Sequence, residues 1–118
     1  MSPAWRLLRV RDGKPCTLFH GYRGSRTLPV NRILVAEEKQ VRNPGKKKGP
    51  TYTSGWHVLP SKKACTEYLT RFKAKDDIVV CRVEVFGVRQ KPRSKVDLAS
   101  GMCIREEDWE AALWENGF

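Results

Sequence analysis

The segment from Ile78 to Arg89 constrains the fold more than any other part of this sequence. Apolar residues occupy every second position within it, namely Val79, Cys81, Val83 and Val85. Successive side chains of a β-strand point to opposite faces, so this spacing predicts a long strand with one apolar face and one mixed face. A strand of this kind belongs to a sheet that is covered on one side. Gly87 is a candidate position for a bulge.

Shorter segments predict the other strands of the sheet. The strands expected at Trp5–Val10 and Cys16–His20 flank the turn signal Asp12-Gly13, which indicates a hairpin. Three more strands are expected, at Arg32–Val41, Thr51–Leu59 and Leu98–Ile104 with an interruption at Gly101. The first two of these three lie on either side of Asn43–Pro50, a loop punctuated by Pro and Gly, so they predict a long hairpin with a basic tip.

Two helices are expected. Ser61 follows Pro60 and is the predicted N-cap of a helix that runs to Lys73, whose apolar face consists of Ala64, Tyr68, Leu69 and Phe72. A second helix is expected at Glu106–Glu115, with Trp109, Ala112 and Leu113 facing inward. The 118 residues therefore predict a single α+β domain over 1–118, with a mostly antiparallel, curved sheet and one or two packed helices.

The positive charge of the chain is concentrated in loops. The formal net charge is +10, with +9 in residues 1–48, +6 in residues 49–95 and −5 in residues 96–118. Clustered cations release counterions when they meet phosphates, so this surface favours DNA, RNA or a nucleoprotein complex as the partner. An exposed aromatic side chain between cations can stack on bases. The candidate binding residues are Arg23, Arg26, Lys46, Lys47, Lys48, Tyr52, Arg89, Lys91, Arg93 and Lys95. The alternative interpretation is a solvated surface that only keeps the protein in solution.

Two short motifs resemble the ADP-ribosyltransferase-like superfamily. Thr17-Leu18-Phe19-His20-Gly21 is similar to its strand-and-glycine motif, and Gly55-Trp56-His57-Val58 is similar to its second motif, in which a strand leads through a turn into a helix. The resemblance covers residues 17–70 and implies a split antiparallel sheet around an NAD cleft, lined by His20, Gly21, His57 and Ser61. The sequence departs from the family where a late strand should begin with an acidic residue, because Glu106 and Glu107 follow that strand.

Other catalytic and metal-binding patterns are poorly represented. The sequence has no Walker-type phosphate loop, no HExxH and no nucleophile elbow. Cys16, Cys65, Cys81 and Cys103 form no CxxC pair, and an intracellular protein would keep them reduced. A Cys–His pair and a zinc site built on Cys16 and His20 stay open as alternatives. We therefore assign no catalytic residue, metal ligand or cofactor, and we leave enzymatic activity undecided with a preference for none.

The general type of the chain suggests a biological setting. Short, basic α+β chains with tryptophans resemble accessory proteins of phages and mobile elements, including anti-CRISPR proteins. No apolar run approaches the roughly 18 residues that span a bilayer, and the N-terminus lacks a signal-like apolar block, so a cytoplasmic location is expected. The leading hypothesis is a binding protein that contacts nucleic acid or a nucleic-acid-handling complex, as an inhibitor of a host defence nuclease. The alternatives are an ADP-ribosyltransferase-like enzyme or degenerate relative, and a structural or assembly protein. The sequence leaves the oligomeric state open.

Overall fold

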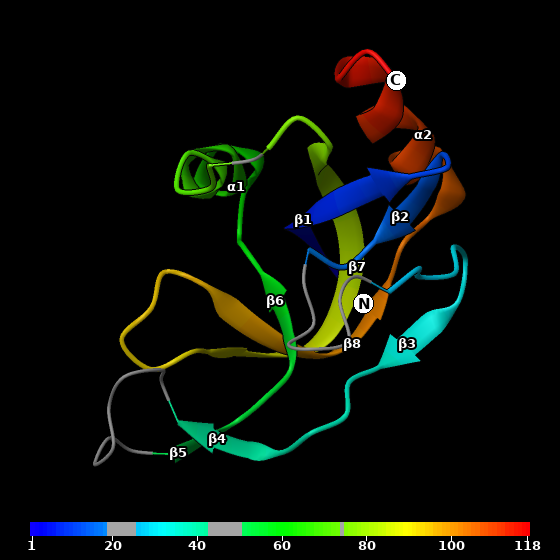
Figure 1. Ribbon diagram of the computed structural model, residues 1–118. Helices are drawn as coiled ribbons and strands as arrows, with labels where there is room; N and C mark the ends of the chain where they lie inside the picture. Colours follow the sequence, from blue (N-terminus) through cyan, green and yellow to red (C-terminus); the bar gives the residue numbers. More distant parts are fainter. Residues whose placement is uncertain (19–25, 43–50, 74) are drawn as a thin grey trace.

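The long strand expected at residues 78–89 is β7 (Ile78–Gln90), the middle strand of the sheet in the computed structural model (Figure 1). The structure describes residues 1–18, 26–42, 51–73 and 75–118. β7 lies between β1 (Ser2–Arg11) and β8 (Asp97–Cys103) and is antiparallel to both. The strand order is β2-β1-β7-β8-β3, and β6 also pairs with β8.

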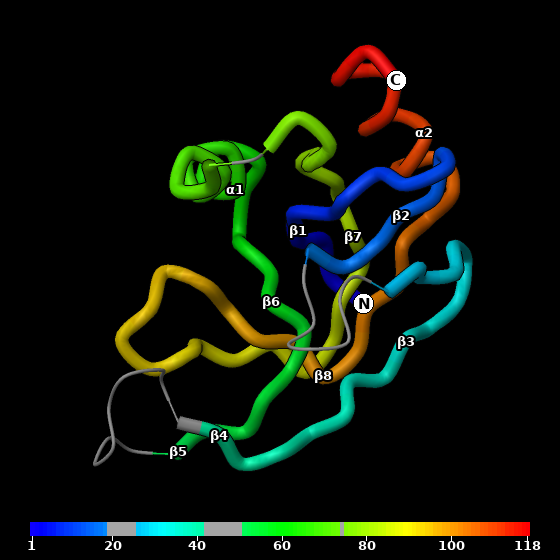
Figure 2. The backbone as a smooth tube through the Cα atoms, in the orientation of Figure 1, coloured from blue at the N-terminus to red at the C-terminus, as the bar shows by residue number. Residues whose placement is uncertain are grey.

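The sheet curls strongly enough for its two sides to meet. Trp5 of β1 and Leu59, which directly follows β6 (Trp56–Val58), exchange two backbone hydrogen bonds of 2.9 and 2.7 Å. β8 pairs with β6 through residues 97–99 and with β3 (Ile33–Val35) through residues 101–103. Figure 2 shows β6 and β3 leading away from each other beside β8. The sheet is therefore an antiparallel half-barrel whose far edge is divided between two strands.

Two helices complete the α+β arrangement that the sequence predicts. α1 (Lys62–Leu69) covers a buried cluster that includes Leu7, Leu59 and Val80. α2 (Glu106–Glu115) has the predicted bounds and inserts Trp109 and Ala112 into the larger core cluster of the sheet. Among the described residues, neither of these short helices has the length and apolar character to cross a membrane.

The acidic helix α2 is paired with cations of the body. Asp108 accepts a hydrogen bond from Arg82 of β7 at 3.3 Å, and Glu115 accepts one from Lys62 of α1 at 2.7 Å. These contacts hold α2 against the sheet and neutralise part of the positive charge on this side of the protein. The remaining cations are considered below with the candidate site.

The first hairpin is tighter than the sequence suggests. Asp12 and Gly13 have φ values of 51° and 73°, which is the conformation of a two-residue turn between right-twisted strands. This turn pairs Arg11 directly with Lys14, so β2 (Lys14–Cys16) begins and ends earlier than the strand predicted at Cys16–His20.

Two predicted strands are each divided in two. The Arg32–Val41 segment forms β3 and β4 (Gln40–Arg42), and the Thr51–Leu59 segment forms β5 (Thr51–Thr53) and β6. β4 and β5 pair as a separate two-stranded sheet, which confirms the base of the predicted hairpin, whereas its basic tip at 43–50 lies outside the described residues. The chain passes between the two sheets at Gly55, where a Cβ would lie 2.7 Å from the carbonyl oxygen of Ala99.

Four smaller predictions also need correction or confirmation. Ser61 is the N-cap of α1, as predicted, because its Oγ accepts a hydrogen bond from the Ala64 N–H at 3.1 Å. The helix ends at Leu69 rather than Lys73, since the next N–H groups bond three residues back in a tighter turn. Gly87 makes no bulge, because the register with β8 is the same before and after it. Its φ of 65° and its contact with Ser100 nevertheless require glycine there, and Gly101 does not interrupt β8.

Candidate functional site

A cavity of about 670 Å³ opens between β1, β6 and α1, which is a volume typical of small-molecule sites. We call it the Trp56 pocket. Four aromatic rings line it, those of Trp56, His57, Tyr68 and Phe72. Its described lining also contains the cations Arg6, Arg26, Lys39 and Lys91.

The charge of this lining is strongly positive. Glu37 is the only carboxylate among the described residues that line the pocket, and its Oε1 lies 3.1 Å from the Nζ of Lys39. The carboxylate therefore neutralises one of the four cations. No ion pair within the described part of the chain involves the other three, Arg6, Arg26 and Lys91.

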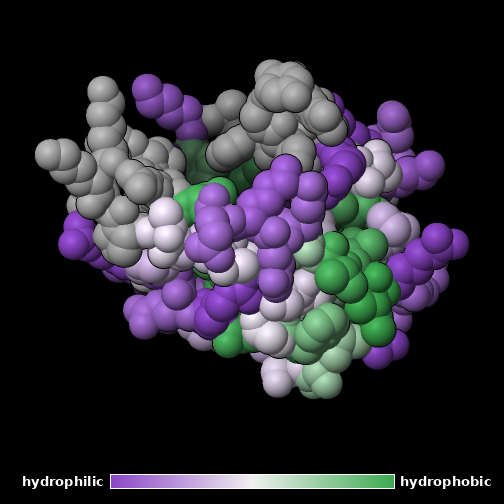
Figure 3. All heavy atoms as spheres, turned by 90° about the horizontal axis from the view of Figure 1, so that it is seen from below, coloured by the Kyte–Doolittle hydropathy of each residue, from purple (hydrophilic) through white to green (hydrophobic). Residues whose placement is uncertain are grey.

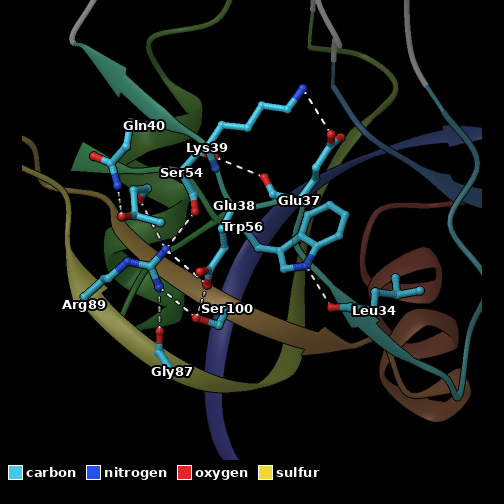
Figure 4. A network of polar contacts seen from close by, with 11 residues as sticks. Leu34, Glu37, Glu38, Lys39, Gln40, Ser54, Trp56, Gly87, Arg89 and Ser100 are labelled. Carbon is cyan, nitrogen blue, oxygen red and sulfur yellow. Dashed lines mark hydrogen bonds and ion pairs between the residues drawn. The ribbon is translucent and has the colours of Figure 1, made fainter. Parts of the chain in front are cut away.

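The indole of Trp56 organises two of these cations. Its Nε1 donates a hydrogen bond of 2.9 Å to the carbonyl oxygen of Leu34, which fixes the ring across the gap between β6 and β3 (Figure 4). The guanidinium carbons of Arg6 and Arg26 lie 5.4 and 5.9 Å from the ring centroid. Both distances are within the range of cation–π attraction, so one indole holds two positive charges at the pocket.

His57 contributes a neutral ring to the same wall. Its backbone carbonyl accepts a 2.7 Å hydrogen bond from Nη1 of Arg6. His57 is exposed at the surface, and neighbouring protein groups displace part of the water around its side chain. This partial loss of water, and then the charges of Lys91 and Arg6, lower the pKa of His57 below its usual value. The imidazole therefore adds no charge at neutral pH.

The sequence-predicted basic residues fall into different places. Arg26 and Lys91 line the Trp56 pocket, and the Lys91 ammonium lies 5.6 Å from the ring centroid of Tyr52 on β5. Arg93 and Lys95 are exposed on the turn that follows β7. The rest of the predicted set, Arg23, Lys46, Lys47 and Lys48, lies outside the described residues.

Arg89, also predicted to bind a partner, has its donors engaged inside the protein (Figure 4). Nη1 donates to the Gly87 carbonyl at 3.1 Å and to the Ser100 hydroxyl at 2.9 Å. Nη2 donates to the carbonyls of Thr53 and Ser54 at 3.2 and 2.7 Å, and it lies 3.7 Å from Glu38. This side chain ties the β4–β5 sheet to the half-barrel.

The residues of the implied NAD cleft are only partly brought together. His57 lines the Trp56 pocket, whereas Ser61 is the cap of α1 and is not among the described lining residues. His20 and Gly21 lie outside the described residues. Leu18 and Arg26, which stand on either side of segment 19–25, both line the pocket.

Arg6 is the pocket residue that sequence reasoning missed. It lies on β1 between Ala4 and Leu8, which are both buried in the larger core cluster. A signal was present, because alternation places a cation on the apolar side of this strand. Within an apolar segment rich in arginine, however, the sequence does not show which guanidinium turns toward a cavity.

The cysteines are the candidate nucleophiles and metal ligands, and the alternative built on Cys16 and His20 lies partly outside the described residues. All four are free and buried. Burial raises the pKa of Cys65 and that of Cys81 to about 12, so both thiols are protonated at neutral pH. The described residues contain no group of three or more potential metal ligands.

An exposed hydrophobic area on β3 and β7 adjoins the Trp56 pocket, whose lining includes Val35. Ile33 and Val35 are 60% and 71% exposed, and Phe86 and Val88 are also exposed. The space-filling view shows hydrophobic residues gathered beside hydrophilic side chains on this face of the molecule (Figure 3).

No protein-family model, curated protein or solved structure matches this chain. The chemistry of the site therefore follows from its own geometry. Unpaired guanidinium groups recognise anions, and fixed aromatic rings bind flat apolar groups. A pocket that combines them suits a ligand with both features.

Proposed function

We propose that this protein binds nucleic acid, which it holds through the Trp56 pocket and the basic surface beside it. The single observation that supports this function is the pairing of cations and aromatic rings in one cavity with a single carboxylate. Nucleic acid offers the complementary groups, since phosphates pair with Arg and Lys while bases stack on aromatic rings. Single strands fit better than duplexes because their bases are free to enter a pocket.

The distribution of charge supports the same proposal. Two acidic residues of α2, Asp108 and Glu115, pair with Arg82 of β7 and Lys62 of α1. The Trp56 pocket keeps three cations without a carboxylate partner among the described residues. Lys91 and Tyr52 extend this surface toward the exposed Arg93 and Lys95. A strand that leaves the pocket would find further cations along this path.

A salt titration with labelled single-stranded oligonucleotides tests the proposal. We expect fluorescence anisotropy to show binding at low salt that weakens as salt rises, with a log–log slope of about 0.7 per phosphate contacted. The double variant Arg26→Glu with Lys91→Glu should weaken binding on the order of tenfold or more. Arg11→Glu, an exposed charge reversal outside the pocket lining, is the matched control and should have a small effect. Absence of binding at low salt would contradict direct recognition.

Inhibition of a host defence nuclease is tested separately, by capture from a host lysate. If the protein acts on a host defence nuclease, capture from a host lysate recovers a nucleic-acid enzyme or its complex. The double variant should lose that capture while Arg11→Glu retains it. Capture that is equal for all three proteins would assign the contact to another surface.

A second candidate function is the binding of NAD. The observation that favours it is the position of His57 in the pocket, with Leu18 and Arg26 beside it. Against this, Ser61 caps a helix, and the only carboxylate of the described lining is paired with Lys39. Calorimetry with NAD decides the point, because heat of binding that is lost in His57→Ala would favour this candidate over nucleic acid. Incubation with labelled NAD and a lysate then shows whether any transfer occurs.

A further inference from the structure

Arg6 is a partly buried cation that makes few hydrogen bonds to the described residues. A guanidinium group has five N–H donors. Only one hydrogen bond from this side chain is formed among the described residues, from Nη1 to the His57 carbonyl. Its Nε is buried and has no partner there, and no carboxylate of the described chain pairs with it. Removing a cation from water without a counter-charge costs free energy, so this arrangement does not serve stability.

Arg26 adds a second positive charge to the same place. The two guanidinium carbons lie 5.4 and 5.9 Å from the centroid of one indole ring. Burial, together with the charge of Arg26, lowers the pKa of Arg6 to about 10. Arg6 is still charged at neutral pH. The pocket therefore contains two like charges beside Trp56, with no carboxylate paired to either among the described residues.

The combined charge of Arg6 and Arg26 favours a phosphomonoester over a phosphodiester as the ligand. An internal phosphodiester carries one negative charge, whereas a phosphomonoester carries about −1.5 to −2 at neutral pH and offers three acceptor oxygens. Lys39 is already paired with Glu37. Of the three cations without an ion pair among the described residues, Arg6 and Arg26 converge on one ring, that of Trp56, whereas Lys91 lies over Tyr52. A phosphomonoester matches two guanidinium groups in charge and in hydrogen-bonding capacity.

We propose that the Trp56 pocket binds a terminal phosphomonoester of a nucleic-acid strand, with Arg6 and Arg26 as the phosphate ligands. This inference rests on the proposed function and makes it more specific, because it predicts recognition of strand ends. The apolar wall of the pocket, formed by Leu7, Leu59, Tyr68 and Phe72, receives the terminal base. The rings of Tyr68 and Phe72 meet edge to face with centroids 5.7 Å apart, which gives this wall a fixed shape.

Oligonucleotides of one sequence with different ends test the inference. Three forms are compared, with a 5′-phosphate, with a 3′-phosphate and with no terminal phosphate. We expect at least one phosphorylated form to bind about tenfold more tightly than the unphosphorylated form. Equal affinity of the wild-type protein for all three would overturn the inference. A free nucleoside monophosphate, AMP, is the fourth ligand, and AMP that binds as tightly as the preferred oligonucleotide identifies the free nucleotide as the source of the phosphate.

Neutral substitutions test whether Arg6 and Arg26 bind the terminal phosphate. Arg6→Met and Arg26→Met should each remove most of the preference for the phosphorylated end while weaker binding of the unphosphorylated strand persists. Arg26 is exposed, so its replacement leaves the core intact even where the Arg6 variant folds poorly. Arg11→Met removes one exposed charge elsewhere and should retain the preference. A preference that survives in both pocket variants would overturn the assignment.

Thermal melting gives a second, independent measurement. AMP should raise the Tm of the wild-type protein and of Arg11→Met, and it should leave that of Arg26→Met nearly unchanged. Two results separate this inference from the proposed function. Salt-dependent binding without any preference for phosphorylated ends would support nucleic-acid binding and contradict the phosphate site at Arg6 and Arg26. Binding of AMP without binding of any oligonucleotide would support the phosphate site and contradict nucleic-acid binding.

Discussion

Arg89 and Arg6 are both partly buried arginines of the sheet, and the protein treats them in opposite ways. Arg89 donates four hydrogen bonds to groups of the protein and lies near Glu38. Arg6 donates one, keeps a buried Nε without a partner among the described residues, and lies close to a second cation. A guanidinium group with four donated hydrogen bonds to the protein holds a structure together. A guanidinium group with open donors in a cavity is prepared for a ligand.

The largest effect that would test this comparison is the loss of Arg89. Arg89→Met leaves the carbonyls of Thr53 and Ser54 without their donor and detaches the β4–β5 sheet from the half-barrel. We expect the free energy of unfolding to fall by about 2–4 kcal/mol, in line with the loss of a partly buried hydrogen-bond network. Urea denaturation followed by circular dichroism measures this value. Lys91→Met removes a neighbouring cation without these bonds and should cost far less.

A smaller cost is expected for the hydroxyl that Arg89 contacts. Ser100 accepts from Arg89 at 2.9 Å and donates to Glu38 at 2.7 Å. Ser100→Ala removes both bonds and should lower the free energy of unfolding by about 1 kcal/mol. In the Arg89→Met background the same substitution should cost less, because the two side chains share an interaction. Costs that simply add in the double variant would show that this network is not coupled.

Arg6→Met should leave the stability of the protein within about 1 kcal/mol of the wild-type value. The loss of one hydrogen bond and of a cation–π contact is offset by relief of a buried charge and of its repulsion from Arg26. The lowered pKa of Arg6 also indicates that its charge destabilises the folded protein. A base whose pKa falls on folding lowers the stability of the folded state at every pH below that pKa. Urea denaturation of both arginine variants in parallel tests the comparison directly. A loss as large as that of Arg89→Met would make Arg6 a structural residue.

The smallest effect is a pH dependence that comes from the pocket. The pKa of His57 is lowered by partial burial and by the charges of Lys91 and Arg6, so at mildly acidic pH the unfolded chain binds a proton that the folded protein does not. Stability from this group is present above pH 6.5 and declines as the pH falls toward the lowered pKa. We expect the Tm of the wild-type protein to drop more between pH 7 and pH 5 than that of His57→Gln. Parallel pH profiles for the two proteins would contradict this assignment.

The elements with strong local signals were predictable from the sequence. Strict alternation from Ile78 to Arg89 identifies β7, and an acidic first turn with an inward Trp109 identifies α2 at its observed bounds. The N-cap at Ser61 and the turn at Asp12-Gly13 also depend on local chemistry. The division of the Thr51–Leu59 strand was not predictable, because it arises where Gly55 passes close to Ala99 and where Ser54 meets Arg89.

The candidate site was predictable only in outline. Loop composition pointed to Arg26, Lys91 and Tyr52, and the described structure brings these residues to the Trp56 pocket or beside it. The same reasoning selected Arg89, since a sequence does not show whether the donors of an arginine face water or the protein. Arg6 was not selected because its candidate role depends on how few hydrogen-bond partners surround it among the described residues, which only the structure shows.

The sequence by itself determined the positive charge, the α+β class and the identity of the long central strand, because each follows from residue type and short-range spacing. Only the tertiary structure decided which cations are neutralised and which remain open. That distinction depends on the curl of the sheet, which brings Leu59 against Trp5 and closes one side of the cavity near Arg6. The charge of a residue follows from its type, whereas its hydrogen-bond and ion-pair partners come from parts of the chain that are distant in sequence. Arg89 donates to Thr53 and Ser54 across the fold, whereas Arg6 lines the Trp56 pocket with one hydrogen bond to the described residues.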